Sequence, residues 1–163
     1  MKLLKSNSTE DWRTASLILR KVAGDLDERG LALWRNDRIS EEFLKSQYSS
    51  NELNLVEQNG HAIGVVFIQN RDHVFWPEIT TDDTVFIHKL AVLPSFRRRG
   101  LGRRVLEEIK NSAIENDKSW LRLDCFDRSS LVRFYESAGF SFVDRKIVMG
   151  SSVFRMQQPL RQC

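Results

Sequence analysis

The sequence predicts a mixed α/β fold, with a sheet of six or seven strands flanked by about four helices. Three observations predict it. Apolar residues recur at helical spacing in the first third, follow strand patterns in the middle third, and alternate between the two toward the end. The chain has 163 residues, without an internal repeat or a Pro/Ser-rich linker. We therefore expect residues 1–163 to form a single domain around one core.

The first third of the chain is predicted to begin with a short strand and a long helix. The apolar pair in KLLK favours a strand over residues 2–5. Apolar residues at positions 12–26 recur at spacings of three and four, which places them on one helical face. A serine and a threonine at 8–9 supply a cap ahead of two acidic residues. Gly24 and Gly30 bracket the breakdown of this helix.

The middle third is predicted to hold a short helix and three strands. Ser40, followed by two acidic residues, is typical of a helix cap. The β-prone runs 53–57 and 62–68 flank an Asn-Gly pair at 59–60, which is a strong hairpin signal. Residues 84–92 are rich in β-branched and aromatic side chains and predict a third strand.

The last third alternates between helix and strand. Residues 100–115 and 129–138 carry apolar stripes that predict helices, and residues 120–125 between them alternate apolar with charged side chains as in a strand. Residues 140–157 are predicted to form a final hairpin that turns near Gly150.

Positive charge is concentrated in one place. The chain carries 25 Lys and Arg against 22 Asp and Glu, a net charge of +3. Removing the five positive charges of one short segment would change this net charge to −2. These residues, called the arginine cluster below, are Arg97, Arg98, Arg99, Arg103 and Arg104. A broadly basic nucleic-acid surface is therefore excluded, and neither an aromatic-rich sheet nor a recognition-helix pattern accompanies the charge, so we expect no nucleic-acid partner.

The arginine cluster surrounds Gly100 and Gly102 at a junction between a predicted strand and a predicted helix. Glycines allow the backbone to approach a ligand closely, and helix-terminal N–H groups with arginines nearby favour phosphate. The segment is not a P-loop, because no Lys-Ser/Thr pair follows the glycines, and Val105 replaces the third glycine of a dinucleotide fingerprint. The sequence predicts a pyrophosphate or nucleotide site here.

Other classes of protein are disfavoured. Cys125 and Cys163 make a poor disulfide framework, and the three histidines are scattered without zinc-ligand spacing, so we expect no metal. The sequence contains neither a secretory signal nor an apolar run long enough to cross a membrane, so we expect no membrane partner. The default expectation is a reduced cytoplasmic protein.

Two motifs resemble one known family. The segment Arg97-x-x-Gly100-x-Gly102, which follows the strand ending at Val92, resembles the acetyl-CoA signature Q/R-x-x-G-x-G/A of the GNAT superfamily of N-acetyltransferases. Phe134-Tyr135-Glu136-x-x-Gly139-Phe140 resembles its second hallmark, F-Y-E-x-x-G-F. The two motifs stand in the order typical of the superfamily, and the element order agrees over nearly the whole chain.

The resemblance implies a mostly antiparallel, splayed sheet in which strands 84–92 and 120–125 part to admit the pantetheine arm of acetyl-CoA, the acyl donor. It implies a set of cofactor-binding residues: Leu90, Ala91, Val92, Arg97, Arg98, Arg99, Gly100, Leu101, Gly102, Arg103, Ser130, Arg133 and Tyr135. One departure from the family is Arg128, at a position where many members carry Asn. Ser129 or Ser130 is a candidate to replace that Asn contact.

The resemblance also implies catalytic roles. Tyr135 takes the place of the family's general acid toward the coenzyme A sulfur, although core packing is the alternative role of this side chain. His88 lies on the strand that resembles the arylalkylamine acetyltransferase strand with two histidines, of which only the second is present here. We expect His88 to be the base, with Glu78 and Asp124 as alternatives or a water relay in their place. The oxyanion is expected to be held by backbone N–H groups of the strand near Leu90–Val92.

The acceptor is expected to be a primary amine of a small molecule or peptide, acetylated by direct transfer in a ternary complex. Aromatic side chains at 34, 43, 75 and 76 are plausible pocket walls, and the substrate pocket is assigned to Trp34, Trp76 and Glu78. A non-catalytic domain that senses coenzyme A or a nucleotide is the alternative function. The last hairpin can pair between subunits, so a homodimer stays open.

Overall fold

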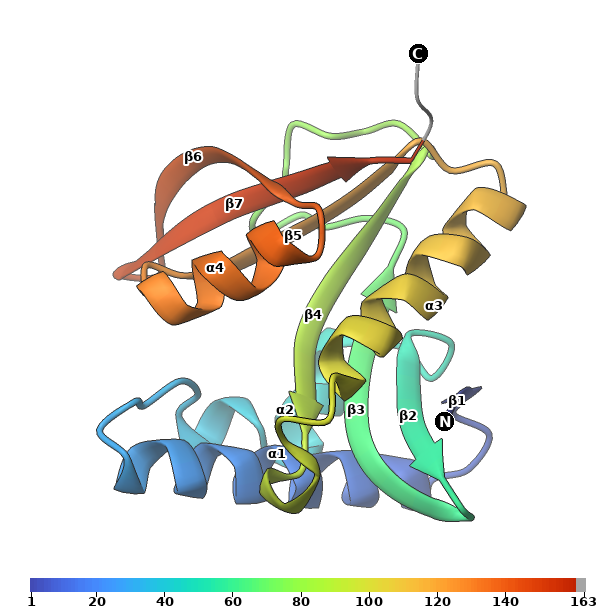
Figure 1. Cartoon of the computed structure of the whole chain (residues 1–163), viewed down its shortest axis with the longest axis vertical. Helices are drawn as coiled ribbons and strands as arrows, with labels where there is room; N and C mark the ends of the chain where they lie inside the picture. Colours follow the sequence, from blue (N-terminus) through green and yellow to red (C-terminus); the bar gives the residue numbers. More distant parts are fainter. Residues whose placement is uncertain (161–163) are drawn as a thin grey trace. The chain divides into compact units, whose positions relative to one another are not determined.

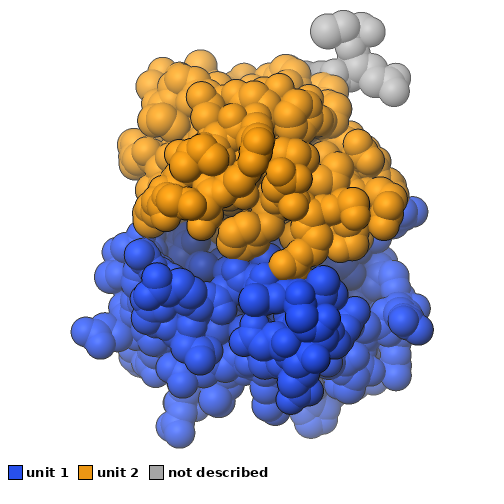
Figure 2. All heavy atoms as spheres, turned by 90° about the vertical axis from the view of Figure 1, so that its left-hand side faces the viewer, with its two compact units in different colours: residues 1–68, 89–105 blue, residues 69–88, 106–163 orange. Residues whose placement is uncertain are grey.

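The computed structural model describes residues 1–160 and divides into two compact units, coloured separately in Figure 2. Unit 1 consists of residues 1–68 and 89–105. Unit 2 consists of residues 69–88 and 106–163, of which the last three, including Cys163, lie outside the described part. Three elements include residues of both units: β3 (His61–Gln69), β4 (Thr84–Val92) and α3 (Leu101–Glu115). A single domain over residues 1–163 stays a prediction.

Over residues 1–160, seven strands form one sheet in the order β1-β2-β3-β4-β5-β7-β6 (Figure 1). The pairs β1/β2, β2/β3, β5/β7 and β6/β7 are antiparallel. The pair β4/β5 is parallel, and its register covers Thr84–Ile87 against Trp120–Leu123. Four α-helices accompany the sheet in the described residues. The predicted mixed α/β fold, with its strand and helix numbers, is confirmed.

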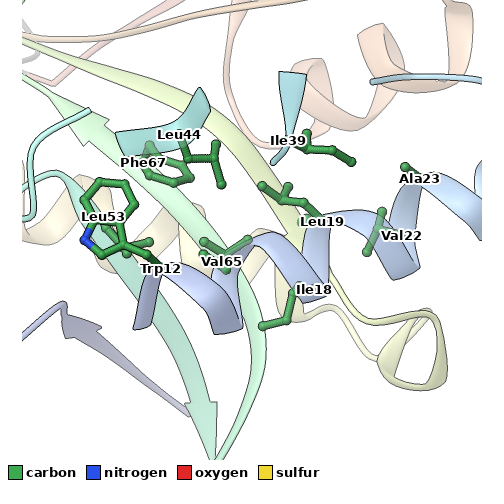
Figure 3. Packing of buried hydrophobic residues seen from close by; sticks show 12 residues of the cluster. Trp12, Ile18, Leu19, Val22, Ala23, Ile39, Leu44, Leu53, Val65 and Phe67 are labelled. Carbon is green, nitrogen blue, oxygen red and sulfur yellow. The ribbon is translucent and has the colours of Figure 1, made fainter. Parts of the chain in front are cut away.

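Unit 1 holds the first half of the chain. Its elements are β1 (Lys2–Lys5), α1 (Glu10–Glu28), the 3-10 turn η1 (Asn36–Arg38), α2 (Glu41–Gln47), β2 (Leu53–Gln58), most of β3 (His61–Gln69), the last four residues of β4, the 3-10 turn η2 (Pro94–Phe96) and the start of α3. Helix α1 packs against α2 and β2 (Figure 1). The core of this unit is a cluster to which α1 supplies Trp12 and Leu19, and β3 supplies Val65 and Phe67 (Figure 3).

Unit 2 holds the second half. Its elements are the first five residues of β4, the rest of α3, β5 (Trp120–Phe126), α4 (Ser129–Ser137), β6 (Ser141–Val148) and β7 (Ser151–Pro159). Helix α4 packs against β5 and β6 (Figure 1). Buried apolar residues form the interior of this unit, among them Phe86, Ile109, Leu123, Ala138 and Met156.

The turns and the short helix follow their predictions. Asn59 and Gly60 have φ values of 53° and 80°, the left-handed pair that a two-residue hairpin of type I′ requires. Met149 and Gly150, with φ values of 49° and 77°, repeat this geometry between β6 and β7. Ser40 caps α2, because its hydroxyl accepts a hydrogen bond from Phe43 N–H at 3.2 Å.

The start of α1 corrects one prediction. Thr9 occupies the cap position without a side-chain bond. Instead, Asp11 Oδ2 accepts hydrogen bonds from the N–H groups of Asn7 and Ser8, at 3.0 and 3.1 Å. A carboxylate thus satisfies backbone donors at the helix start, where the hydroxyls were expected to act. The end of α1 agrees with its prediction, because the helix stops at Glu28, between Gly24 and Gly30, so that only its start differs from the sequence-based expectation.

Candidate active site

The second half of β4, in unit 1, changes backbone conformation where the acyl donor is expected to bind. Lys89 has a φ of 49°, a left-handed value inside a strand, which breaks the regular pleat as a bulge does. Ala91 then lies so close to β3 that a Cβ added to Gly64 would be 2.6 Å from its carbonyl oxygen. Leu93 N–H donates to Ile63 O at 2.8 Å. The irregularity at Lys89 therefore precedes Leu90–Val92, a segment that lies close to β3 at Ala91 and is followed by a bond to β3 at Leu93.

The arginine cluster lies on the turn that leads into α3, also in unit 1. Arg98 and Gly100 both have positive φ, at 59° and 68°. The first helical hydrogen bond runs from Arg104 N–H to Gly100 O at 3.1 Å. The helix-terminal N–H groups of Leu101 and Gly102 precede that bond, so they point out of the helix start, where an anion can bind. This geometry is compatible with the predicted phosphate site, whose contacts with a cofactor stay predictions; residues 97–103 are called the anion-binding turn below.

Arg97 has a fixed partner within unit 1. Its Nη1 donates a hydrogen bond to Asp25 Oδ2 of α1. That bond, with the positive charge of Arg97 and a weaker bond from Arg29, holds the pKa of Asp25 below its ordinary value against a small effect of desolvation. Arg97 is thus fixed to α1, while the Arg99 guanidinium stacks 5.3 Å from the centre of the Phe96 ring.

Helix α4 of unit 2 carries the second motif. Arg128 precedes the helix without a side-chain cap bond, Ser130 and Arg133 are exposed or partly exposed, and Ser129 opens the first turn. Both candidate serines therefore lie at the helix start, where the family's Asn contact is missing. Their contacts with a cofactor stay predictions.

Tyr135, on the same helix, is held edge-on by Phe134 and Phe140, at ring distances of 5.0 and 5.9 Å. Burial raises the pKa of the Tyr135 phenol well above its ordinary value, and negative charge on Cys125 and Asp124 acts in the same direction. The hydroxyl therefore keeps its proton at neutral pH. A group that holds one proton in an apolar site can serve as a general acid.

Cys125 is the one free cysteine among residues 1–160, and it is buried on β5. Burial raises the pKa of its thiol to about 12, with help from the charges of Asp124 and Asp127. The nucleophilic form of cysteine is the thiolate. Cys125 is therefore a packed thiol and a poor nucleophile.

His88, the last residue of β4 within unit 2, lies between two carboxylates. Its Nε2 is 3.3 Å from Asp72 Oδ2, and its Nδ1 is 3.6 Å from Asp124 Oδ1. The side chains of His88 and Asp72 are 8% and 3% exposed, and that of Asp124 is 16% exposed. The position of Asp124 follows from the β4/β5 register, in which Ile87 pairs with Leu123. The predicted base and one of its alternatives therefore belong to one cluster, called the histidine cluster below.

Asp72 was missed by sequence reasoning. It lies in the loop after β3, where its Oδ1 accepts hydrogen bonds from Val74 N–H and Phe75 N–H at 3.0 and 2.8 Å. Asp two residues before a donor is a common turn pattern, so the sequence could have predicted the turn. Nothing in the sequence connects it with His88, because the contact joins two segments that only the folded chain brings together.

Arg155, which sequence reasoning also missed, secures the segment that follows Asp72. Its guanidinium binds both oxygens of Asp144 at 2.7 Å, donates to Phe75 O at 3.0 Å, and pairs with Glu78. These bonds raise the pKa of Arg155. Desolvation raises the pKa of Glu78, but a hydrogen bond from its own backbone N–H, followed by the hydrogen bond and charge of Arg155, holds that pKa below its ordinary value. Glu78 is consequently a weak base, and its contact with an acceptor stays a prediction.

The predicted pocket aromatics lie in different surroundings. Trp76 is 2% exposed, with the guanidinium groups of Arg155 and Arg122 at 4.2 and 5.5 Å from its ring. Trp34, in unit 1, is partly exposed beneath Lys89 Nζ at 5.7 Å. The Phe75 ring lies 6.2 Å from the ring of the predicted base. The roles of Trp34 and Trp76 toward an acceptor stay predictions.

Sequence comparison connects the chain with acetyltransferases. The family model for the GNAT acetyltransferase domain matches residues 22–158. An uncharacterized N-acetyltransferase, YesJ of Bacillus subtilis, is 33% identical over 73 residues. This alignment covers 44% of the chain and 41% of YesJ, so the chain matches less than half of that relative's length.

Solved structures share the fold. The ribosomal-protein-S18-alanine N-acetyltransferase of Escherichia coli has a TM-score of 0.72 at 19% identity, with 99% of this chain and 95% of that chain covered. AAC(6')-Ib, solved with ribostamycin and coenzyme A, has a TM-score of 0.75 at 19% identity, with 97% and 92% covered. Because the family model covers both motifs and most of the chain, the protein belongs to the GNAT acetyltransferase family.

Proposed function

We propose that the protein transfers the acetyl group of acetyl-CoA to a primary amine. The observation that carries this proposal is the histidine cluster, which places a titratable imidazole between two carboxylates at the end of the β4/β5 ladder. Family membership supports acetyl-CoA as the donor. Acetyl transfer to an amine needs a base for the amine proton and an acid for the thiolate, and unit 2 contains a candidate for each.

His88 supplies the base. An alkyl ammonium with a pKa of about 10.4 must lose a proton before it attacks, at a cost of about 4.6 kcal/mol at pH 7. A base within reach, directly or through one water, offsets part of that cost. In this proposal the amine nitrogen bonds to the thioester carbonyl carbon and its proton passes to the His88 imidazole.

Tyr135 supplies the acid. When the C–S bond breaks, the departing thiolate takes the phenolic proton, and solvent restores it afterwards. The phenol is protonated at neutral pH, as a general acid must be before that step. Asp124 interacts with both groups. Its Oδ1 lies 3.6 Å from His88 Nδ1, and its negative charge contributes to the raised pKa of Tyr135. The buried, protonated Cys125 supports direct transfer in a ternary complex without an acetyl-cysteine intermediate.

The donor's phosphates are assigned to the anion-binding turn at Arg97–Arg103, in unit 1. Helix-terminal N–H groups bind phosphate oxygens, and the arginines of the cluster add charge-assisted contacts. The left-handed residue Lys89, which interrupts the strand just before Leu90–Val92, supports the assigned contacts of that segment with the pantetheine arm. The backbone N–H groups of this segment are the proposed oxyanion donors.

The acceptor is proposed only as a primary amine of a small molecule or peptide. The solved relatives named above differ in the amine-bearing molecules that their names give, and a shared fold does not select among them. No helix among residues 1–160 is long and apolar enough to span a membrane. A cytoplasmic location is proposed on the single observation that the described cysteine is a free thiol.

We propose a homodimer formed through β6. This strand is the outermost in the sheet order, and it and its turn expose Phe142, Ile147 and Met149. A second copy fits such an edge, because antiparallel pairing of one strand with its own copy about a twofold axis is self-complementary. Light scattering should give twice the chain mass, and Ile147→Lys should give the monomer. A wild-type monomer at high protein concentration would rule the dimer out.

The proposed activity is tested by thermal stability and thiol release. Acetyl-CoA at about 100 times its Kd should stabilise the protein by about 2.7 kcal/mol, which raises Tm by about 5–10 °C in a chain of this size. Free thiol should then appear only when pooled primary amines are added. Stabilisation without acetylation of any amine would favour the alternative of a coenzyme A sensor, and the absence of both would overturn the assignment.

A further inference from the structure

We propose that Asp72 is a positioning residue that holds a proton on His88 Nε2, so that His88 accepts the substrate proton on Nδ1. This inference rests on the proposed function only for its catalytic consequence. It assigns a role to a residue that neither motif contains. The two nitrogens of the ring face different carboxylates, at 3.3 and 3.6 Å.

The protonation of the ring follows from its neighbours. A neutral imidazole carries one N–H, so only one of the two carboxylates can accept a hydrogen bond from it. The doubly protonated ring satisfies both. Asp72 is the more buried carboxylate, at 3% exposure against 16% for Asp124. We therefore assign the permanent proton of the neutral ring to Nε2, which faces the more buried Asp72. The proton exchanged with the substrate is assigned to Nδ1, which faces the more exposed Asp124.

The two carboxylate oxygens of Asp72 have different surroundings. Its Oδ1 is occupied by two backbone N–H groups, of Val74 and Phe75, at 3.0 and 2.8 Å. Its Oδ2 is buried and accepts no hydrogen bond from any described residue. The contact at 3.3 Å is an ion-pair contact that still lacks hydrogen-bond alignment, and catalytic pairs often align only when the substrate is bound. The negative charge of this oxygen faces the His88 ring.

The loop that carries Asp72 is fixed to the sheet of unit 2. Arg155 donates to the carbonyl of Phe75 at 3.0 Å, stacks 4.2 Å from the ring of Trp76 and pairs with Glu78. Three attachments within a few residues of Asp72 leave its carboxylate little freedom. The position of Asp72 against His88 is therefore a property of the packed unit.

Charged groups face or adjoin His88 from several elements. Asp72 faces it from the loop after β3 and Asp124 from β5. Arg155 of β7 is the register partner of Asp124, and Tyr135 of α4 feels the charge of Asp124. Removing the charge of Asp72 leaves the remaining groups in place. Because a nearby carboxylate favours the imidazolium, the ring should then lose its second proton at lower pH.

A metal ion is the competing interpretation of the same atoms. One ligand atom each from Asp72, His88 and Asp124 can be chosen so that all lie within 4.8 Å of one another. However, the two short contacts of 3.3 and 3.6 Å join different ring nitrogens to different carboxylates, as the two hydrogen bonds of an imidazolium would. The geometry therefore favours a proton shared between His88 and a carboxylate. The experiment below includes metal binding as one of its outcomes.

The direct test is the ¹⁵N NMR titration of the histidine rings in the wild type and in Asp72→Asn. The asparagine side chain keeps an oxygen for the turn, so the loop should survive the change. The exposed ring of His61 serves as the reference in the same spectra, because it lies at the opposite end of β3 from the loop that carries the substituted residue. We expect neutral His88 to carry its proton on Nε2 in the wild type, and its titration midpoint to fall by about one pH unit in Asp72→Asn. The reference signal should not move.

The proposal fails if His88 is protonated on Nδ1 in its neutral form, or if its midpoint is the same in both proteins. It also fails if Zn²⁺ added to the protein shifts the His88 signals at stoichiometric concentration, because the cluster would then be a metal site. None of these readouts needs an acceptor. A correct titration without acetyl transfer would therefore refute the proposed function and leave this inference intact.

The catalytic consequence is measured separately. In Asp72→Asn, kcat should fall about tenfold or more and the acidic limb of its pH profile should move to lower pH, while KM for acetyl-CoA changes less than about twofold. The control is Asp82→Asn, an exposed aspartate in the same loop that pairs with Arg71. A merely structural role would leave the limb in place and alter kcat and KM together.

Discussion

The anion-binding turn of unit 1 and the histidine cluster of unit 2 are built in opposite ways. The turn consists of consecutive residues, with a positive φ at Arg98 and Gly100 and arginines around them. The histidine cluster gathers Asp72, His88 and Asp124 from a loop and two strands. A continuous site can bind a common group such as phosphate through the backbone, whereas the proposed proton transfer depends on side chains from separate segments.

This difference predicts that changes in the histidine cluster affect turnover and that changes in the turn affect donor binding. The largest effect is expected for His88→Gln. Loss of a general base should lower kcat by about 10²–10³-fold, with KM for acetyl-CoA close to that of the wild type. Initial rates of thiol release measure both. His73→Gln, on the exposed loop, should behave as the wild type, and an equal loss in that variant would break the comparison.

Arg155→Met is expected to be the largest change in stability. Loss of this buried guanidinium, whose carboxylate partners Glu78 and Asp144 are 50% and 38% exposed, should cost about 1–3 kcal/mol in the free energy of unfolding. Urea titration measures it. Arg145→Met, at an exposed pair with Asp127, should cost less than about 0.5 kcal/mol.

The Arg155–Asp144 pair also gives a pH dependence. The hydrogen bond from Arg155 holds the pKa of Asp144 below its ordinary value, against desolvation, with further help from the charge of Arg155. A lowered pKa adds stability that is complete above the unfolded value of about 3.9 and is lost as pH falls through the folded value. Wild-type stability should therefore decline below about pH 4 more steeply than that of Arg155→Met. Parallel pH curves would contradict this.

Tyr135→Phe tests the proposed general acid of unit 2. The ring packing against Phe134 and Phe140 is kept, but the proton for the thiolate is lost. We expect kcat to fall about tenfold with unchanged acetyl-CoA affinity, measured by initial rates and calorimetry. A variant with full turnover would remove Tyr135 from the mechanism and leave it as a packing residue.

The smallest effect is expected in the turn of unit 1. Gly100 has a φ of 68° and open space around its Cβ position, so Gly100→Ala incurs only the left-handed backbone cost of about 1 kcal/mol. If that cost falls on donor binding, KM for acetyl-CoA should rise about fivefold with little change in kcat. Gly24→Ala, in the interior of α1 with equal space, should be neutral or stabilising by about 0.5–1 kcal/mol. Equal losses in both variants would contradict the assignment of the turn.

The contrast between the two sites also explains what the sequence could predict. Hydrophobic periodicity identified every strand and helix, because each pattern is local. The turn and Tyr135 were accessible for the same reason, through short motifs. Asp124 could be placed beside His88 only by assuming a register between two parallel strands. Asp72 and Arg155 were not accessible, since their partners lie far along the chain and the residues themselves resemble ordinary loop and strand positions.

Glu78 shows that a residue selected from the sequence can have a different chemistry in the folded protein. As a sequence position it was a candidate base in an irregular segment. In the folded unit it is paired with Arg155, and its pKa is held low although burial opposes the shift. A carboxylate's chemistry depends on the cation beside it, and that neighbour comes from β7.

The central claim is that unit 2 transfers the proton while the turn of unit 1 binds the donor. Calorimetric titration of acetyl-CoA into His88→Gln tests it most directly, beside the turnover of the same preparation. We predict a Kd within about twofold of the wild type and a kcat lower by at least about 10²-fold. Loss of acetyl-CoA affinity in proportion to the loss of turnover would contradict it.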